Sequence, residues 1–117
     1  MIYFVGNNEQ IFDSEQFYTA TIEDVVKYCS NKAFLGVDTE TTGLDFISND
    51  MTMFQIGDHI AQFVIDTRVI SIEPLKDILT SKDIVKIFHN AKFDINFIRS
   101  HANIKCNSVY DTMLVEK

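Results

Sequence analysis

Short apolar blocks and amphipathic segments follow one another along the chain, and their periods predict strands and helices in turn. The residues "IYFV" (2–5) indicate a short strand, while "AFLGVD" (33–38) and "DIVKIF" (83–88) are apolar runs typical of strands buried on both faces. The segments "MTMFQIGD" (51–58) and "AQFVIDT" (61–67) indicate two more strands, joined into a hairpin by a loop of about two to four residues.

Helical patterns lie between these strands. In "TIEDVVKYCS" (21–30) Thr21 suits the N-cap, and the apolar residues repeat on one face. "SIEPLKDILTS" (71–81) carries Pro74 in its first turn, where a missing N–H does no harm, and "NAKFDINFIRSHA" (90–102) has a third helical pattern. This order of elements predicts one α/β domain that takes in the whole chain, with a mixed sheet and helices packed on it.

The composition supports a folded domain and indicates in which cellular compartment it is expected. The 117 residues are 46% hydrophobic and include ten Phe, which suffices for the core of one domain. No apolar run approaches the roughly 20 residues that span a membrane, and no signal peptide opens the sequence. Cys29 and Cys106 have neither a metal-site nor a disulfide-framework spacing, so we expect an intracellular, cytoplasmic protein.

The net charge of −7 is unusual for a protein that binds nucleic acid, because phosphate binders usually carry a basic patch. An acidic chain can still bind phosphates when metal ions neutralise the carboxylates of its site. The plainer alternative is that the excess acid only keeps a small domain soluble.

The stretch "DTETTGLD" (38–45) places two carboxylates at the end of an apolar strand. Since strand side chains alternate, Asp38 and Glu40 share a face and Thr39 points to the other. Two such carboxylates repel each other unless a cation lies between them, and the carboxyl end of a strand is where α/β sheets bind ligands. Oxygen ligands without neighbouring Cys or His favour Mg²⁺ or Mn²⁺. Taken alone, the pair is explained at least as well as a solvated strand end before a polar turn.

A third carboxylate strengthens the metal hypothesis. Asp94 follows the strand "DIVKIF" in the first turn of the next helix, where the helix dipole also stabilises a negative charge. If the two strands are neighbours, Asp94 can face Asp38 across a cleft. Three convergent carboxylates suit a two-metal site for phosphoryl transfer, with ions about 3.5–4 Å apart.

These stretches together resemble a known family. "DTETTGLD" followed by "FHNAKFD" (88–94) is similar to the first and second motifs of the DEDD superfamily of 3′–5′ exonucleases, which have a ribonuclease H-like fold and four acidic metal ligands. The resemblance extends from about residue 33 to the end of the chain. "MFQIGD" and "QFVIDTR" match the hairpin between the motifs, and "VYDTMLVEK" (109–117) is similar to the next helix in bacterial-type DNA polymerase proofreading domains.

The resemblance implies roles for individual residues. Asp38, Glu40 and Asp94 match the first three metal-binding acids of the family. Four further residues match positions that contact the substrate, namely Thr41, Thr42, Leu44 and Asn90. Each of the four also has a structural alternative: two turn residues, a core leucine after a turn, and a helix N-cap.

The third motif of the family supplies the fourth acid, as Tyr-x-x-x-Asp or His-x-x-x-x-Asp, and neither form occurs after Asp94. "HNAKFD" fits the second form by its letters, but it follows a strand and opens a helix as the second motif does. The short interval between the first two motifs favours the Tyr branch. "VYDTMLVEK" begins a helix with Asp111 as its N-cap and stops after about two turns without a stop signal. We therefore expect a C-terminally truncated exonuclease domain.

The function implied is that of a metal-dependent 3′–5′ exonuclease with two Mg²⁺ or Mn²⁺ ions, acting on the 3′ end of single-stranded DNA. It would belong to the DNA polymerase of a bacterium or phage, with the polymerase domain in cis or on another chain, and would be weak or inactive as this piece. Two alternatives stay open. The substrate could be RNA, as for ribonuclease D, or the chain could be a non-catalytic module that associates with itself or a partner through surface exposed by the truncation.

Overall fold

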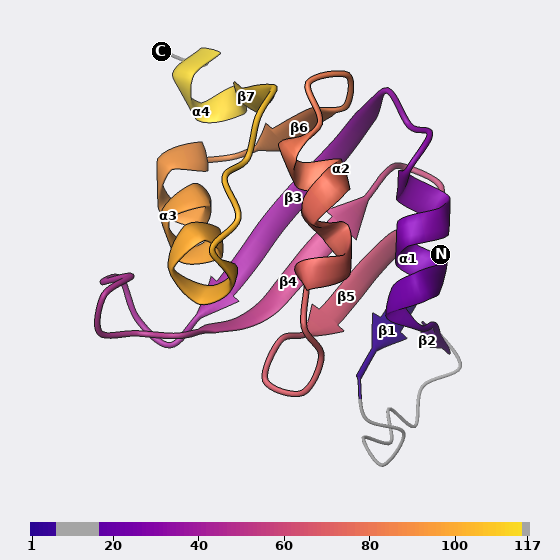
Figure 1. The fold of residues 1–117 in the computed structure, drawn as a ribbon, viewed down its shortest axis with the longest axis horizontal. Coiled ribbons are helices and arrows are strands. Elements are labelled where there is room, and N and C mark those ends of the chain that lie inside the picture. The colour runs from indigo at the N-terminus through magenta and orange to yellow at the C-terminus, as the bar shows by residue number, and fades with distance from the viewer. Residues whose placement is uncertain (7–16, 116–117) are drawn as a thin grey trace.

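A seven-stranded mixed sheet forms the centre of the molecule (Figure 1). The computed structural model describes residues 1–6 and 17–115. Across the sheet the strands follow the order β2-β1-β5-β4-β3-β6-β7. Their bounds are Ile2–Val5 for β1, Phe17–Thr19 for β2, Phe34–Thr41 for β3, Met51–Gly57 for β4, Gln62–Asp66 for β5, Val85–Phe88 for β6 and Val109–Asp111 for β7. The predicted mixed sheet is confirmed.

The directions of the strands decide where their polar ends gather. β4 runs antiparallel to its neighbours β3 and β5, and the predicted hairpin is confirmed with residues 58–61 as its loop. The remaining pairs in the described part of the chain are parallel. All strands except β4 therefore run in one direction, and their carboxyl ends lie along one edge of the sheet.

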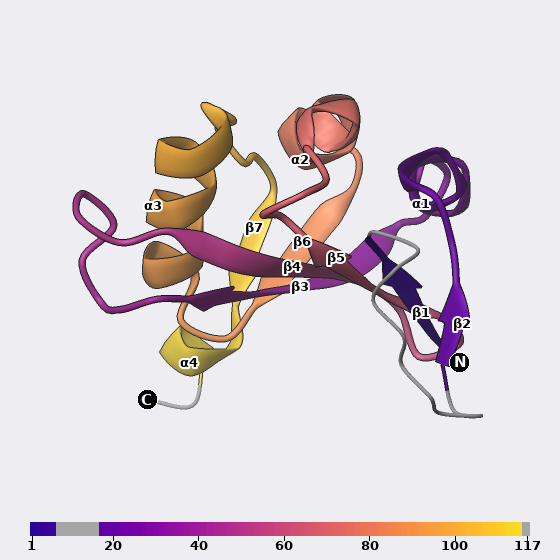
Figure 2. The same ribbon diagram turned by 90° about the horizontal axis from the view of Figure 1, so that it is seen from below.

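The three longer helices cover a single face of the sheet, and the short α4 lies on the other side (Figure 2). The predicted helical segments 21–30, 71–81 and 90–102 are confirmed, and Thr21 caps the first through a capping box with Asp24. No helix within residues 1–6 and 17–115 is long and apolar enough to cross a membrane. The bounds are Ile22–Cys29 for α1, Lys76–Thr80 for α2 after the 3₁₀ turn η1 (Glu73–Leu75), Ala91–Ala102 for α3 and Thr112–Val115 for α4.

β3 and β6 are buried on one face, not on both as their apolar runs predict. Along β3, Leu35, Val37 and Thr39 are buried, whereas Phe34 is 63% exposed and Asp38 faces solvent. β6 alternates in the same way. The prediction is wrong because the larger helices all pack on the same side of the sheet, which leaves the opposite face of these strands open.

Two strands of three residues each, β2 and β7, lie at the edges of the sheet and were not predicted. β7 occupies Val109–Asp111, which the sequence assigns to the start of a helix, and α4 begins only at Thr112. Pairing with β6 decides the conformation of this segment, because Ile87 lies opposite Tyr110 and Phe88 opposite Asp111. The prediction for the last two residues of the chain lies outside the described part.

The hairpin loop is anchored to α1 through Asp58. Its carboxylate accepts hydrogen bonds from the Tyr28 hydroxyl at 2.7 Å and from the N–H groups of Ile60 and Ala61 at 3.0 Å, and it pairs with Lys32 at 3.3 Å. The hydrogen bonds from Ala61 and Tyr28 hold the pKa of Asp58 well below its ordinary value, although burial opposes them. The loop and the helix are thus joined on the helical side of the sheet.

A buried lysine fixes α2. Lys86 of β6 has no exposed surface, and its Nζ donates to the carbonyl oxygens of Ile78 at 3.1 Å and Ser81 at 2.6 Å. These carbonyls lie at the C-terminal end of α2, where a cation is favourable. Burial lowers the pKa of Lys86, since the charged form loses its hydration.

Candidate active site

β3 presents Asp38 and Glu40 on the open face of the sheet, as the alternation of its side chains predicts. Both residues are exposed, whereas Thr39 between them points into the core and is 6% exposed. Asp38 lies opposite Gln55 of β4, and both line a cleft of about 480 Å³ on this face. The pair is therefore accessible to a ligand at the carboxyl end of β3.

His89 and Thr112 line the same cleft from the turn after β6 and from the start of α4. The Nδ1 atom of His89 lies 2.9 Å from the Thr112 hydroxyl, which also donates to the carbonyl oxygen of Phe88 at 3.2 Å. These contacts hold His89 in the lining of the cleft, to which Asp38 also belongs.

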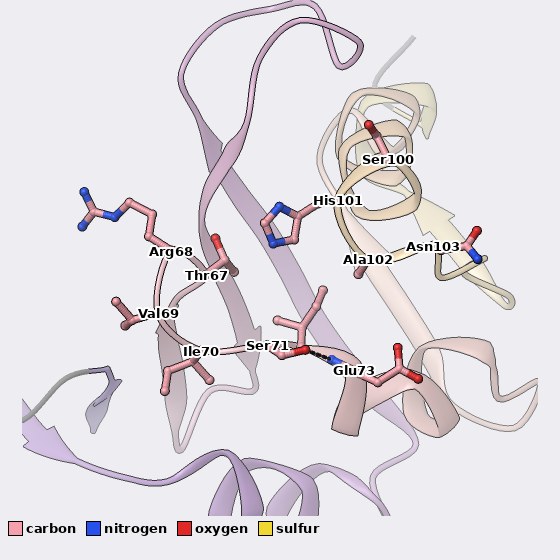
Figure 3. A pocket seen from close by; sticks show the side chains of 11 residues that line it. Thr67, Arg68, Val69, Ile70, Ser71, Glu73, Ser100, His101, Ala102 and Asn103 are labelled. Atoms are coloured by element: carbon pink, nitrogen blue, oxygen red, sulfur yellow. Dashed lines mark hydrogen bonds between the residues drawn. The ribbon is translucent and has the colours of Figure 1, made fainter.

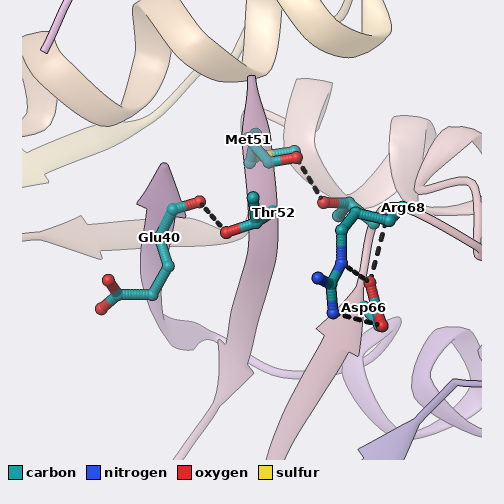
Figure 4. Close-up of polar contacts among 6 residues, drawn as sticks. Glu40, Met51, Thr52, Asp66 and Arg68 are labelled. Atoms are coloured by element: carbon teal, nitrogen blue, oxygen red, sulfur yellow. Dashed lines mark hydrogen bonds and ion pairs between the residues drawn. The ribbon is translucent and has the colours of Figure 1, made fainter. Parts of the chain in front are cut away.

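Backbone contacts with β4 fix Glu40 and leave its carboxylate directed away from that strand (Figure 4). The Thr52 hydroxyl donates to the carbonyl oxygen of Glu40 at 3.2 Å. Glu40 pairs with Met53, and Met53 pairs with Asp66 of β5, so the three form one cross-strand row. Asp66 in turn accepts two hydrogen bonds of 3.0 Å from the side chain of Arg68.

Asp94 reaches β3 from the helical side. It lies in the first turn of α3 and is 3% exposed, and its carboxyl accepts a hydrogen bond from the Thr39 hydroxyl. β3 and β6 are parallel neighbours, as the site hypothesis requires. Because Thr39 points away from the face of Asp38 and Glu40, the structure brings the three acids to one short stretch of β3 but not onto one face.

Burial raises the pKa of Asp94 to about 6, from an ordinary value of 3.8. The hydrogen bond from Thr39 acts in the opposite direction, while the negative charges of Asp38, Asp111 and Glu40 each raise the pKa further. The carboxyl of Asp94 is thus coupled electrostatically to both acids of the open face. A cation among them would relieve this repulsion.

Within residues 1–6 and 17–115, no three His, Cys, Asp or Glu side chains are grouped closely enough to hold a metal ion as they stand. The chemistry of the acids nevertheless fits a hard divalent cation, because carboxylate oxygens are the ligands that Mg²⁺ and Mn²⁺ prefer. The raised pKa of Asp94 fits as well, since a buried carboxylate near two others is the group that gains most from a neighbouring positive charge.

A second cleft, of about 300 Å³, brings together two of the predicted substrate residues, Leu44 and Asn90. Leu44 is 87% exposed in the loop between β3 and β4, which excludes the alternative of a core leucine. Asn90 stands at the N-cap position of α3, but its side chain makes no capping hydrogen bond. The rest of the lining consists of Phe46, Lys92, Phe93, Asn96 and Phe97.

Thr41 and Thr42, the other two predicted substrate residues, hold the loop that carries Leu44. The Thr41 hydroxyl donates to the carbonyl oxygen of Gly43 at 2.7 Å. The Thr42 N–H donates to the carbonyl oxygen of Asp50 at 2.9 Å, and the Thr42 hydroxyl accepts from the N–H of Asp50 at the same distance. In this structure the two threonines therefore make the turn contacts of their structural alternative.

Asp111 has a wider role than the sequence indicates. It caps its own helix by accepting from the Met113 N–H at 3.0 Å, as predicted. It also accepts from the N–H groups of Asn90 at 3.0 Å and Ala91 at 2.8 Å, at the start of α3. Burial works against its ionisation, but the three backbone hydrogen bonds together lower the pKa of Asp111. No local pattern predicts the second contact, because it joins residues 20 positions apart.

A third cleft, of about 510 Å³, lies between residues 67–73 and the C-terminal end of α3 (Figure 3). His101 reaches into it from α3, while Arg68 points outwards. None of the residues predicted for the site lines this cleft. We therefore place the candidate active site at β3 and the start of α3.

Comparison with known proteins gives one consistent result. A family model described as 3′–5′ exonuclease matches residues 11–117. DNA polymerase I of Aquifex aeolicus (strain VF5) is 34% identical over 94 residues, which cover 80% of this chain and 15% of that protein. The chain thus spans less than a sixth of this relative.

Among solved structures, Brucella melitensis NrnC with bound Mg²⁺ has a TM-score of 0.70 at 21% identity, covering 95% of this chain and 49% of that one. The same protein bound to pGG gives a TM-score of 0.75 at 20% identity, over 98% and 50% of the two chains. Escherichia coli RNase D, an exoribonuclease involved in structured RNA processing, gives 0.73 at 19% identity, over 81% and 26%. At these identities the likeness concerns the fold.

Substituting the buried acid tests the electrostatics of the site. Since the pKa of Asp94 is higher in the folded chain than its ordinary value of 3.8, the stability it contributes is present below about pH 4 and is lost as the pH rises through about 6. Asp94→Asn keeps an acceptor for Thr39 and carries no charge. We expect it to raise the free energy of unfolding by about 2 kcal/mol near pH 8 and by little near pH 4.

Urea unfolding at the two pH values, without divalent metal, measures this difference. Asp83→Asn, at an exposed position, is the matched control and should show no such dependence. An Asp94→Asn variant less stable than the parent near pH 8 would contradict the raised pKa.

Proposed function

Because the chain belongs to the 3′–5′ exonuclease family, we propose that it is the proofreading exonuclease part of a DNA polymerase and removes nucleotides from DNA 3′ ends. The observation that carries the proposal is the exposed pair Asp38 and Glu40 at the carboxyl end of β3, with Asp94 bound to Thr39 between them. A polymerase domain, in cis or on another chain, is the partner that this function implies.

Asp38, Glu40 and Asp94 are the residues that would hold divalent cations. Mg²⁺ or Mn²⁺, when bound, supplies Lewis-acid activation of water and neutralises charge on the leaving oxygen. The positive charge also accounts for how a chain of net charge −7 accepts a phosphodiester. With Asp94 buried against Thr39, cation binding at this site is coupled to ionisation of that carboxyl.

The substrate end is proposed to occupy the cleft of about 300 Å³ that Leu44 and Asn90 line. Leu44 offers an exposed apolar side chain against which a terminal base can pack, and Asn90 offers an amide for hydrogen bonds near the 3′ end. Lys92 lines the same cleft and supplies a positive charge near the sugar-phosphate backbone. Thr41 and Thr42 make hydrogen bonds within the loop that carries Leu44. We propose that they contribute to substrate binding indirectly, by fixing the conformation of this loop.

DNA is the proposed substrate because DNA polymerase I, a relative matched over 80% of this chain, acts on DNA by its name. The alternative, RNA, has support from the fold shared with RNase D. A 2′-hydroxyl is the group that separates the two substrates. Labelled DNA and RNA strands of equal sequence, degraded side by side, distinguish them.

The activity of the chain is expected to be weak, since the sequence after Asp94 contains neither form of the third motif. One missing acid or base commonly costs about 10²–10⁴-fold in rate. With enzyme in excess and Mn²⁺ present, 5′-labelled single-stranded DNA should shorten slowly from its 3′ end. Asp38→Asn should abolish the shortening.

The product ladder on a denaturing gel is the measurement. Shortening that persists in Asp38→Asn, or cleavage inside the strand, would refute the proposed site. Rapid shortening by the parent chain would instead show that three acids suffice without the missing motif.

Leu44 is tested against a neighbour in the same loop. Ile47 is 82% exposed and does not line the cleft, so Ile47→Ala is a matched control for Leu44→Ala. We expect Leu44→Ala to weaken binding of single-stranded DNA about tenfold, since full burial of a leucine side chain against a base contributes about 1.5–3 kcal/mol. Both variants should keep their stability within about 0.5 kcal/mol because both side chains are exposed. Fluorescence anisotropy with a labelled strand measures the affinities, and equal losses in both variants would reject the role of Leu44.

A second candidate function, a module that associates with itself or a partner chain, is favoured by the open face of the sheet. Phe34 is 63% exposed beside its neighbour Val85, and Tyr110 is 47% exposed beside Ile87. Exposed apolar surface of this kind is typical of interaction sites.

Self-association through this face is tested with Phe34→Ser and with Val69→Ser, a residue 51% exposed that lies outside the face, as control. If the face binds a second copy, light scattering should give a mass that rises with concentration for the parent and for Val69→Ser only. A parent chain that stays monomeric at high concentration rules out this function for the chain by itself.

A further inference from the structure

Asn90 adopts a backbone conformation that separates its two possible roles. Its φ of 73° and ψ of 61° lie in the left-handed region, which Asn tolerates better than other residues with a side chain. A residue that caps a helix with its own side chain has an extended backbone instead. The Asn90 side chain accordingly makes no capping hydrogen bond and lines the cleft with Leu44.

Asp111 takes over the missing cap from another strand. Its Oδ1 accepts from the Asn90 N–H at 3.0 Å, and its Oδ2 accepts from the Ala91 N–H at 2.8 Å. Figure 1 places β7 and α4 beside the end of α3 that follows β6, so this contact joins elements that meet in space. Thr112 adds a contact to the carbonyl oxygen of Phe88 at 3.2 Å, which holds the same turn from its other side.

We propose that Asp111 is a positioning residue of the active site, whose carboxylate caps α3 from outside and thereby keeps the Asn90 amide available to the nucleic acid. Either Asp111 or Asn90 can cap the N-terminal end of α3, but only one of them does so at a time. While Asp111 satisfies the first N–H groups of α3, Asn90 stays left-handed and faces the cleft. Without Asp111, the favoured arrangement is for Asn90 to extend and cap the helix itself, because Asn is among the best N-cap residues.

The substrate half of this inference rests on the proposed function, whereas the exchange of caps concerns folding alone. Two independent measurements therefore separate them. One is the stability of the 117-residue chain, and the other is its affinity for a single-stranded oligonucleotide.

The stability measurement is a double-mutant cycle with Asn90→Gly and Asp111→Ala, followed by urea unfolding. In the parent, Asn90→Gly should not lower the urea midpoint, since glycine tolerates the left-handed backbone and the amide caps nothing. In the Asp111→Ala background the same substitution should lower the midpoint, since Asn90 has become the cap. If Asp111→Ala does not fold, Asp111→Asn, which keeps the side-chain size and one carbonyl oxygen, replaces it in the cycle.

The binding measurement uses a short 5′-labelled oligodeoxythymidylate with Mn²⁺ and fluorescence anisotropy. Asn90→Ala and Asp111→Ala should each weaken binding about tenfold, the worth of about one good hydrogen bond, and the double variant should be no weaker than either single one. A purely structural Asp111 would give losses that add.

Asn103 provides the matched control. It is also a left-handed Asn, with φ of 56°, at the opposite end of the same helix. Asn103→Gly should change stability equally in the parent and in the Asp111→Ala background, and it should leave DNA binding unchanged.

The outcomes separate the two proposals. Additive stability effects of Asn90→Gly and Asp111→Ala overturn the exchange of caps, whatever the DNA result. A parent chain that binds the oligonucleotide, with additive losses in the variants, overturns the positioning role and leaves the exonuclease function intact. A parent that does not bind refutes the proposed function, while the stability cycle still decides which residue caps α3.

Discussion

The alternation of side chains along β3 is the constraint on which the rest of the structure depends. Its buried positions, Leu35 and Val37, join the core beneath the helices, and the same register sends Asp38 and Glu40 to the open face. A slip of one residue would bury both acids and expose the core positions, so hydrophobic burial fixes the direction of the carboxylates at no further cost. The exposure of Asp38 and Glu40 thus follows directly from the packing of helices on only one face of β3.

Thr39 extends this constraint to the third acid. As the buried residue between Asp38 and Glu40, it offers its hydroxyl to Asp94 and so ties α3 to the strand that carries the other two. The tie keeps three like charges close without bringing them onto one face, and the resulting repulsion appears in the raised pKa of Asp94. Stability and the proposed cation binding would be opposed here, because the burial that orders the helix disfavours the ionised form that a cation needs.

The sequence predicts those parts of the structure that depend on local periods. The alternation at Asp38 and Glu40, the hairpin and the start of α1 at Thr21 follow from spacing and capping rules, and the structure agrees with each of them. One-sided burial could not be predicted, because "AFLGVD" reads the same whether helices cover one face of β3 or both. The strand β7 was missed for a related reason, since three residues carry too little pattern to outweigh the helical appearance of the segment.

The contacts of Lys86 and Asp111 could not be predicted from the sequence, because each joins two different elements of the fold. The run "DIVKIF" predicts a buried strand but not the groups that accept hydrogen bonds from Lys86, which are carbonyl oxygens at the C-terminal end of α2. Asp111 is a plausible N-cap from its neighbours alone, and its second task at α3 depends on the parallel pairing of β7 with β6. The turn between β6 and α3 is therefore shaped from outside, by a segment that follows it in sequence. Asp111 satisfies the first backbone N–H groups of α3, so the side-chain amide of Asn90 does not have to cap the helix. That amide therefore stays available for the proposed binding of substrate.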